Sequence, residues 1–190
     1  MLLVHGRGAS AADIMTVGAE LMHPGFAYLA PQAAGGTWYP NRFTDPIATN
    51  EPWLGSAMEI LASLLHRILA SVPAERTILL GFSQGACLTL EFAARHARRY
   101  GGVAGLSGGL IGPDDTPRDY EGTFAGTPVF LGCSDVDPHI PKERVIATGE
   151  VFKRMEAEVQ VRLYPGMGHT VSGQEIAALG EIISALDPLR

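Results

Sequence analysis

The segment Thr77–Leu90, TILLGFSQGACLTL, constrains the fold of this chain more than any other stretch. It begins with the apolar run Ile78–Leu80, which predicts a short buried strand. A sharp turn follows, Gly81-Phe82-Ser83-Gln84-Gly85, and then a largely apolar helix. A G-x-S-x-G turn between a strand and a helix lifts its serine above the end of a sheet, where the hydroxyl can act as a nucleophile. Ser83 is therefore the candidate nucleophile.

A second copy of the same five-residue pattern, Gly105–Gly109, competes with the first. It also follows an apolar run, but it continues into Leu110–Pro113, where no amphipathic helix begins. The motif requires a strand before the turn and a helix after it. This context favours Ser83 over Ser107.

The amino-acid composition limits which classes of protein this chain can belong to. The chain has 190 residues, 46% of them hydrophobic and 18% charged, which predicts a single globular domain over residues 1–190. A net charge of −6 and the lack of a basic run disfavour nucleic-acid binding. No apolar run is long enough to span a bilayer.

The chain has only two cysteines, Cys87 and Cys133, which is too few for a disulfide framework. They also lack zinc-ligand spacing, so we expect buried free thiols and a cytoplasmic location. No metal cluster and no phosphate-binding loop is recognisable in the sequence, so we expect no metal and no cofactor.

Alternating strand and helix patterns predict the architecture. Six apolar runs are typical of strands: Leu2–Val4, Phe26–Ala30, Ile78–Leu80, Gly102–Ser107, Val129–Gly132 and Val159–Leu163. Most are separated by helical patterns, and such alternation predicts an α/β fold with a doubly wound, mainly parallel six-stranded sheet flanked by helices. Because the first strand begins at residue 2, we expect this sheet to lack leading N-terminal strands.

Reactive residue types gather in the loops that follow the predicted strands. In a parallel sheet of this kind, active sites lie at the carboxyl ends of the strands. The loops at those ends contain His5-Gly6-Arg7-Gly8, Trp38-Tyr39, Ser83, Asp135 with Asp137, and His169. We therefore expect these residues to meet at one edge of the sheet.

A serine hydroxyl needs a base, and the base needs an acidic partner that holds its tautomer. The chain order serine, acid, histidine is met by Ser83, the Asp135–Asp137 loop and His169. His169 ends the glycine-containing loop that follows the last predicted strand, and the other histidines lie before the nucleophile, on helices or beside the acid. The residues alone leave both Asp135 and Asp137 open as the acid.

Two backbone N–H groups are expected to form an oxyanion hole. One belongs to Gln84, directly after the nucleophile, and the other to Arg7 in the first strand–helix loop. The long connection over residues 31–52 carries Trp38 and Tyr39. These rings either wall an apolar substrate pocket or pack down as a small satellite core that holds the loop. Both interpretations stay open.

Four motifs, taken in order, resemble the phospholipase/carboxylesterase family of α/β-hydrolases, which includes acyl-protein thioesterases and small bacterial carboxylesterases. The motifs are His5-Gly6-Arg7-Gly8, Gly81-Phe82-Ser83-Gln84-Gly85, Asp137-Pro138-His139-Ile140-Pro141 and Gly166-Met167-Gly168-His169. The resemblance spans nearly the whole chain and implies an α/β-hydrolase fold.

The resemblance also implies roles for individual residues. In this family the acid is the aspartate directly before the proline, which implies a Ser83–Asp137–His169 triad. It implies oxyanion donors at Arg7 and Gln84, and often a homodimer. Trp38-Tyr39-Pro40 is similar to the substrate-side loop of the small bacterial members, whereas Arg7 stands where the family usually has leucine.

The expected function is hydrolysis of small-molecule carboxylic esters through an acyl-enzyme on Ser83. The same machinery suits a thioesterase or a lysophospholipase. Two alternatives stay open: a non-catalytic, ligand-binding relative of the same fold, and an amidase or peptidase that uses the same triad. Loops rather than the fold decide among these substrates.

Overall fold

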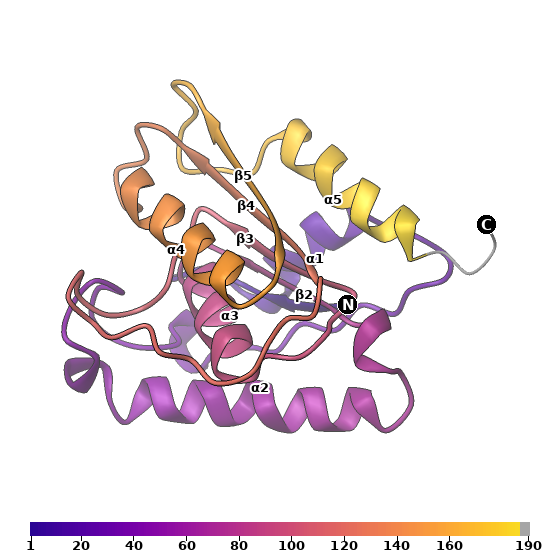
Figure 1. Ribbon diagram of the computed structural model, residues 1–190, viewed down its shortest axis with the longest axis horizontal. Coiled ribbons are helices and arrows are strands. Elements are labelled where there is room, and N and C mark those ends of the chain that lie inside the picture. Colours follow the sequence, from indigo (N-terminus) through magenta and orange to yellow (C-terminus); the bar gives the residue numbers. More distant parts are fainter. Residues whose placement is uncertain (187–190) are drawn as a thin grey trace.

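The computed structural model describes residues 1–186, which form a central sheet with helices on both faces (Figure 1). The strands are β1 Leu2–Val4, β2 Ile78–Phe82, β3 Gly102–Leu106, β4 Pro128–Ser134 and β5 Glu158–Tyr164. Every neighbouring pair is parallel, and the order across the sheet is β1-β2-β3-β4-β5. The fold class predicted from the alternation of strands and helices is confirmed.

In the part of the chain that the structure describes, five α-helices connect and cover these strands. They are α1 Ala11–Glu20, α2 Trp53–Leu69, α3 Gln84–Arg95, α4 Lys142–Arg154 and α5 Gly173–Ala185, with short 3-10 helices at Ala34–Gly36, Ile47–Asn50 and Ala74–Arg76. Helices α1 and α5 pack on one face of the sheet, and α3 and α4 pack on the other, with α2 against α3 (Figure 1). No helix in the described part of the chain is long and apolar enough to cross a membrane.

Burial on both faces explains why the elbow strand is a continuous apolar run. Successive side chains of a strand point to opposite faces of the sheet. In β2, Leu79 lies in the core beneath α3, whereas Ile78 and Leu80 lie in the core beneath α1 and α5. A parallel strand covered on both sides therefore needs apolar residues at every position.

The strand predicted at Phe26–Ala30 is wrong, and within residues 1–186 the sheet has five strands instead of six. This segment makes one isolated parallel bridge, between Leu2 and Leu29. Leu3 N donates to Leu29 O at 2.8 Å, and Leu29 N donates to Met1 O at 2.9 Å. The segment thus meets β1 around Leu29 alone, whereas β2 pairs with all three residues of β1. No strand precedes β1 among the described residues, as predicted.

Capping boxes define the starts of α1 and α5. Ser10 accepts from Asp13 N, and Ser172 accepts from Glu175 N, while each acidic side chain accepts in return from the N–H of its serine. Each box satisfies two N–H groups that a helix start would otherwise leave unpaired. The second box fixes the point at which the loop that carries His169 ends.

Both thiols are buried and free, as predicted. Burial raises the pKa of Cys87 to about 12 and the pKa of Cys133 to about 12. The reactive form of cysteine is the thiolate, so neither residue is a nucleophile at neutral pH.

Candidate active site

Ser83 lies in the turn between β2 and α3 with an unusual backbone conformation. Its φ is 55° and its ψ is −122°, a combination that few residues other than glycine adopt. Ser83 N donates to Leu106 O at 2.9 Å, and Cys87 N donates to Ser83 O at 3.0 Å. Strained backbone of this kind persists only where its surroundings hold it. Here β3 and the first turn of α3 hold it.

Two glycines make the tight turn sterically feasible. A Cβ at Gly81 would lie 2.2 Å from Gly85 O, and a Cβ at Gly85 would lie 2.2 Å from Val4 O. Both clashes are with backbone atoms, which no rotamer change relieves. The spacing of the motif therefore reflects the close approach of β1, the turn and α3.

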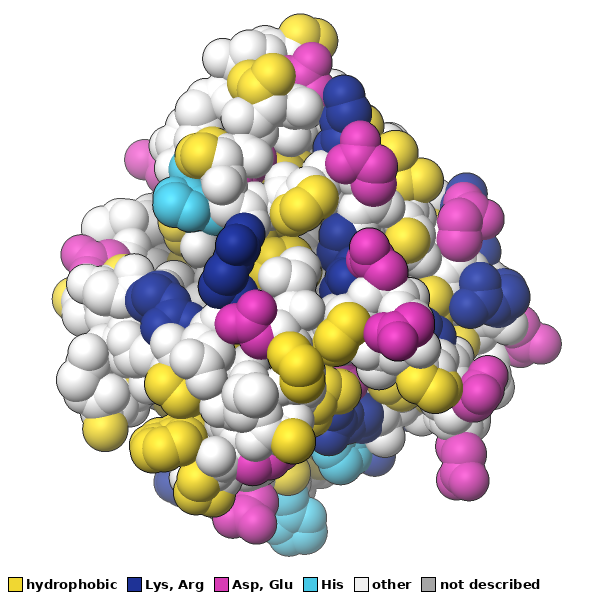
Figure 2. Space-filling view, turned by 90° about the vertical axis from the view of Figure 1, so that its left-hand side faces the viewer, with side chains coloured by type: hydrophobic (Ala, Val, Ile, Leu, Met, Phe, Trp, Pro, Cys, Tyr) yellow, Lys and Arg dark blue, Asp and Glu magenta, His cyan; other side chains and the backbone are white. Residues whose placement is uncertain are grey.

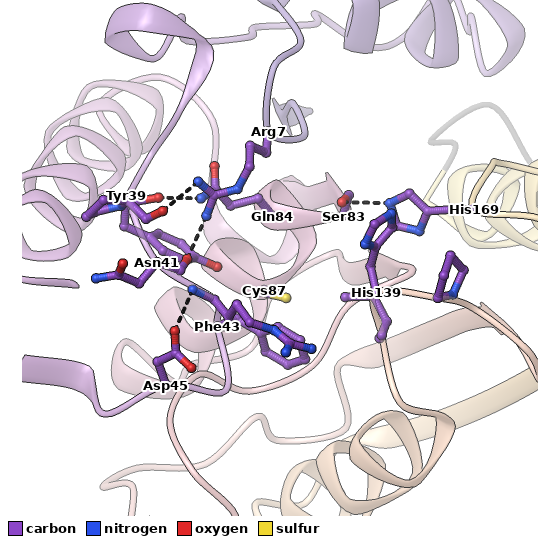
Figure 3. Close-up of a pocket in the computed structure, with 14 residues that line it drawn as sticks. Arg7, Tyr39, Asn41, Phe43, Asp45, Ser83, Gln84, Cys87, His139 and His169 are labelled. Carbon is purple, nitrogen blue, oxygen red and sulfur yellow. Dashed lines mark hydrogen bonds between the residues drawn. The ribbon is translucent and has the colours of Figure 1, made fainter. Parts of the chain in front are cut away.

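A continuous hydrogen-bonded relay links Ser83, His169 and Asp137. Ser83 Oγ lies 2.8 Å from His169 Nε2 (Figure 3), and His169 Nδ1 lies 2.7 Å from Asp137 Oδ2. A carboxylate only accepts hydrogen bonds, so the proton of the neutral imidazole belongs on Nδ1. His169 Nε2 is then free to accept from the serine hydroxyl.

The Asp137 carboxylate is held from several sides, and its side chain is 0% exposed. Its Oδ1 accepts from the backbone N–H of His139 at 2.8 Å and of Ile140 at 3.0 Å. Burial raises the pKa of this carboxyl, but the hydrogen bonds from His169 and these two N–H groups outweigh burial and leave the pKa below its ordinary value. Asp137 is therefore ionised at neutral pH.

Asp135 has a different task. Its Oδ1 accepts from the backbone N–H of Gly166 at 2.8 Å. This bond ties the loop after β4 to the loop after β5, and so holds the segment that carries His169. Of the two candidate acids, the structure brings Asp137 to the imidazole.

The rival serine, Ser107, lies at the end of β3 and is completely buried. Its φ of 51° resembles that of Ser83. In the described chain, the next α-helix after Ser107 is α4, which begins at Lys142. The structure thus gives this second motif a strand and a turn, but no helix directly after it.

The two expected oxyanion donors belong to segments that meet at Ser83. Gln84 is the first residue of α3, and a helix leaves the N–H of its first residue without an intrahelical acceptor. Arg7 belongs to the loop between β1 and α1. This loop lies against the turn, since a Cβ at Gly6 would be only 3.2 Å from the Cβ of Ser83.

A cavity of about 750 Å³ opens beside Ser83 and His169. The strands end toward the left of Figure 1, and Ser83 directly follows β2 at this end of the sheet. Figure 2 shows that side of the molecule, where basic, histidine and acidic side chains lie among hydrophobic ones. The lining residues are Arg7, Tyr39, Pro40, Asn41, Arg42, Phe43, Asp45, Ser83, Gln84, Cys87, Pro138, His139, Ile140 and His169 (Figure 3). The cavity is thus built by four loops and the start of α3.

Tyr39 and Trp38 occupy different layers of the cavity wall. Tyr39 lines the cavity, and the Arg7 guanidinium carbon lies 5.9 Å from the centre of its ring. Trp38 is not among the lining residues. Its Nε1 donates to His5 O at 2.8 Å, and its ring centre lies 4.9 Å from that of His5. Both side chains are nevertheless buried in the core, with Tyr39 1% and Trp38 3% exposed, so the structure favours the packed support of the loop for both and leaves Tyr39 at the border of the cavity.

Sequence reasoning missed His139 as a residue of the cavity wall. Its ring lies edge-on to the His169 ring, with 4.9 Å between the centres. The available signal was its position two residues after Asp137, in a loop that must turn back toward the base. Cys87 was missed as a lining residue for another reason, because it is a buried apolar residue that sequence cannot distinguish from the core.

The parallel sheet, the serine on a strand–helix turn, and the carboxylate and imidazole after later strands define an α/β-hydrolase. The chain matches the phospholipase/carboxylesterase family model over residues 1–187 and belongs to that family.

Solved and curated relatives agree with this placement. The crystal structure of a phospholipase/carboxylesterase from Dyadobacter fermentans DSM 18053 is 41% identical, with a TM-score of 0.91 over 96% of this chain and 88% of that chain. Acyl-protein thioesterase 1 of Debaryomyces hansenii is 31% identical over 63% of this chain and 53% of the relative. Acyl-protein thioesterase 1 of Saccharomyces cerevisiae is 28% identical over 70% of this chain and 60% of the relative. The chain thus spans little more than half the length of these curated relatives.

Proposed function

We propose that this chain is a serine hydrolase that cleaves carboxylic esters through an acyl-enzyme on Ser83. The observation that carries the proposal is the relay of Ser83 Oγ, His169 and Asp137, with contacts of 2.8 Å and 2.7 Å. In this relay the imidazole can take the serine proton while the carboxylate stabilises the imidazolium. A complete relay beside an open cavity also argues against a purely ligand-binding role.

In the first half of the reaction, Ser83 Oγ attacks the ester carbonyl carbon as its proton passes to His169 Nε2. The carbonyl electron pair moves to the oxygen, and the resulting oxyanion accepts from the backbone N–H groups of Gln84 and Arg7. Asp137 remains ionised and holds the imidazolium by its Nδ1–H. Collapse of the intermediate breaks the bond to the leaving group, which takes the proton from His169 Nε2.

In the second half, water replaces the leaving group. His169 Nε2 removes a proton from water as the water oxygen attacks the acyl carbon. The oxyanion forms again in the same hole, and its collapse breaks the bond to Ser83 Oγ. The serine recovers its proton from His169, and the carboxylic acid leaves.

The cavity supports a small-molecule substrate. Its volume of about 750 Å³ is within the range of ligand sites. In this proposal Tyr39 borders the cavity from the buried core, and Tyr39 and Trp38 both act by supporting the loop. Relatives named acyl-protein thioesterase favour thioesters as a second substrate class, because a thiolate leaves in the same step as an alcohol does.

A fluorophosphonate probe and p-nitrophenyl esters of graded chain length test the proposal. We expect the wild type to be labelled and to hydrolyse the esters, and Ser83→Ala to lose labelling and at least about 10³-fold in kcat. Ser107→Ala is the matched control, since this buried serine belongs to the second copy of the motif. A wild type that neither labels nor hydrolyses any ester would sink the esterase assignment, and an active Ser83→Ala would exclude Ser83 as nucleophile. Matched p-nitroanilides distinguish an amidase.

A further inference from the structure

Residues 36–41, here called the wall segment, are bonded to both segments that carry the oxyanion donors. Two hydrogen bonds join the wall segment to the loop after β1. In one, Gly8 N donates to Gly36 O at 2.8 Å, and in the other, Trp38 Nε1 donates to His5 O at 2.8 Å. The remaining bonds come from the side chains of Gln84 and Arg7. The same wall segment contributes Tyr39 to the cavity.

The Gln84 side chain uses both ends of its amide on the backbone of the wall segment. Its Oε1 accepts from Trp38 N at 3.0 Å, and its Nε2 donates to Tyr39 O at 2.7 Å (Figure 3). Gln84 is only 6% exposed, so water competes weakly for these bonds. A buried N–H and a buried carbonyl of the wall segment thus depend on one side chain.

The Arg7 side chain makes a second, parallel connection. Its Nη1 donates to Pro40 O at 2.8 Å, and its Nη2 donates to Asn41 O at 2.6 Å. The guanidinium also lies over the Tyr39 ring. The two terminal nitrogens are therefore engaged by backbone carbonyls, which explains an arginine in this loop without invoking an anionic substrate.

We propose that the side chains of Gln84 and Arg7 are positioning groups that lock the wall segment to the oxyanion hole. The proposal rests on the proposed function, in which the backbone N–H groups of the same two residues receive the oxyanion. Each residue then acts twice, since its N–H contacts the reacting oxygen and its side chain holds the wall. The cavity and the hole are thereby one hydrogen-bonded unit, and loosening the wall shifts the donors.

Substitution can separate the two tasks, because any replacement other than proline keeps the backbone N–H. Gln84→Met has similar length and removes both bonds to the wall segment. Arg7→Met removes the second connection. Arg67→Met, at an exposed position of α2, is the matched control for loss of an arginine.

Amide hydrogen exchange of residues 36–41 and steady-state kinetics test the proposal together. In Gln84→Met we expect the Trp38 N–H to exchange at least about tenfold faster, and kcat to fall about 10–100-fold with KM changed less than about threefold. Arg7→Met should show smaller changes of the same kind, because its contacts are exposed. The effects of the two substitutions on kcat should not multiply in the double variant, since both act through one segment.

Unchanged exchange at residues 36–41 in Gln84→Met would overturn the proposal, as would an unchanged kcat. Exchange needs no substrate, so a wild type without ester activity would refute the proposed function while faster exchange still supported the locked wall. Should Gln84→Met fail to fold, Gln84→Glu replaces it, because a protonated carboxyl also has one donor and one acceptor. In Gln84→Glu the Trp38 N–H should then exchange at the wild-type rate in acid and faster than in wild type in alkali. A ratio of the two exchange rates that does not change with pH would contradict the proposal.

Discussion

Asp137→Asn should disable the base while leaving the fold in place, because of how the carboxylate is held. Oδ1 accepts from two backbone N–H groups, those of His139 and Ile140. An asparagine NH₂ at that position would face two donors, so the amide must place its oxygen there. The NH₂ then takes the place of Oδ2, 2.7 Å from His169 Nδ1.

This orientation reverses the relay. An NH₂ facing Nδ1 donates to it, so the imidazole proton moves to Nε2 and faces Ser83 Oγ, where a lone pair is needed. In a serine protease triad, the equivalent substitution lowers kcat about 10⁴-fold. With about 1.36 kcal/mol for each factor of ten, the loss corresponds to about 5.4 kcal/mol of transition-state stabilisation. We expect a decrease of this size here.

Asp135→Asn is the matched control, since an asparagine oxygen can still accept from Gly166 N and keep the two loops tied. Its kcat for a p-nitrophenyl ester should stay within about fivefold of wild type, because changing a hydrogen bond that is kept alters the free energy by about 1 kcal/mol or less. Thermal unfolding establishes that both variants are folded. This account of the acid would be refuted if Asp137→Asn kept more than about a tenth of the wild-type kcat. It would also be refuted if Asp135→Asn lost more kcat than Asp137→Asn.

Two further predictions concern stability. Gly85→Ala should destabilise the protein by more than about 3 kcal/mol in urea unfolding, because its Cβ would lie 2.2 Å from Val4 O. Gly180→Ala in α5 has open space around its Cβ and should stabilise the protein by up to about 1 kcal/mol. Equal effects of the two substitutions would contradict the steric argument. Burial raises the pKa of Glu175 despite its bonds from Ser172, so the stability it contributes is present below the ordinary glutamate pKa of about 4.3 and is lost as pH rises through the raised value. The Tm of Glu175→Gln relative to wild type should therefore increase from about pH 4 toward neutrality, and a constant or decreasing difference would be evidence against burial as the cause.

Local patterns predicted the elements whose causes are local. The strand–turn–helix around Ser83 is contiguous in sequence, so its pattern can be recognised without the rest of the chain. The Phe26–Ala30 run failed as a strand because a strand also needs a partner that pairs along its length. Strand β1, which begins 24 residues earlier counted between their first residues (26 − 2), meets the run through one isolated bridge at Leu29, and the path that limits this pairing is not visible in the run itself.

Within the candidate site, the residue types and their order predicted which side chains the structure brings together at Ser83. The choice of Asp137 over Asp135 needed more than the residues, because both follow the same strand and only the path of the loop decides which faces His169. The side-chain contacts of Gln84 with Trp38 join positions 46 residues apart. Such a contact has no periodic or spacing signal, so it emerges only from the folded chain.

The connections from Gln84 and Arg7 to the wall segment share one property: they end on main-chain atoms, namely the N–H of Trp38 and the carbonyls of Tyr39, Pro40 and Asn41. The exposed side chains at residues 40 and 41 can therefore change without loosening these connections. Positions 38 and 41 must avoid proline, because Trp38 N donates to Gln84 Oε1 and Asn41 N donates to Asn50 Oδ1. The wall segment can thus vary its exposed residues while its main-chain hydrogen bonds stay the same. A library randomised at positions 40 and 41, which both line the cavity, can search substrate preference while Gln84 and Arg7 stay unchanged.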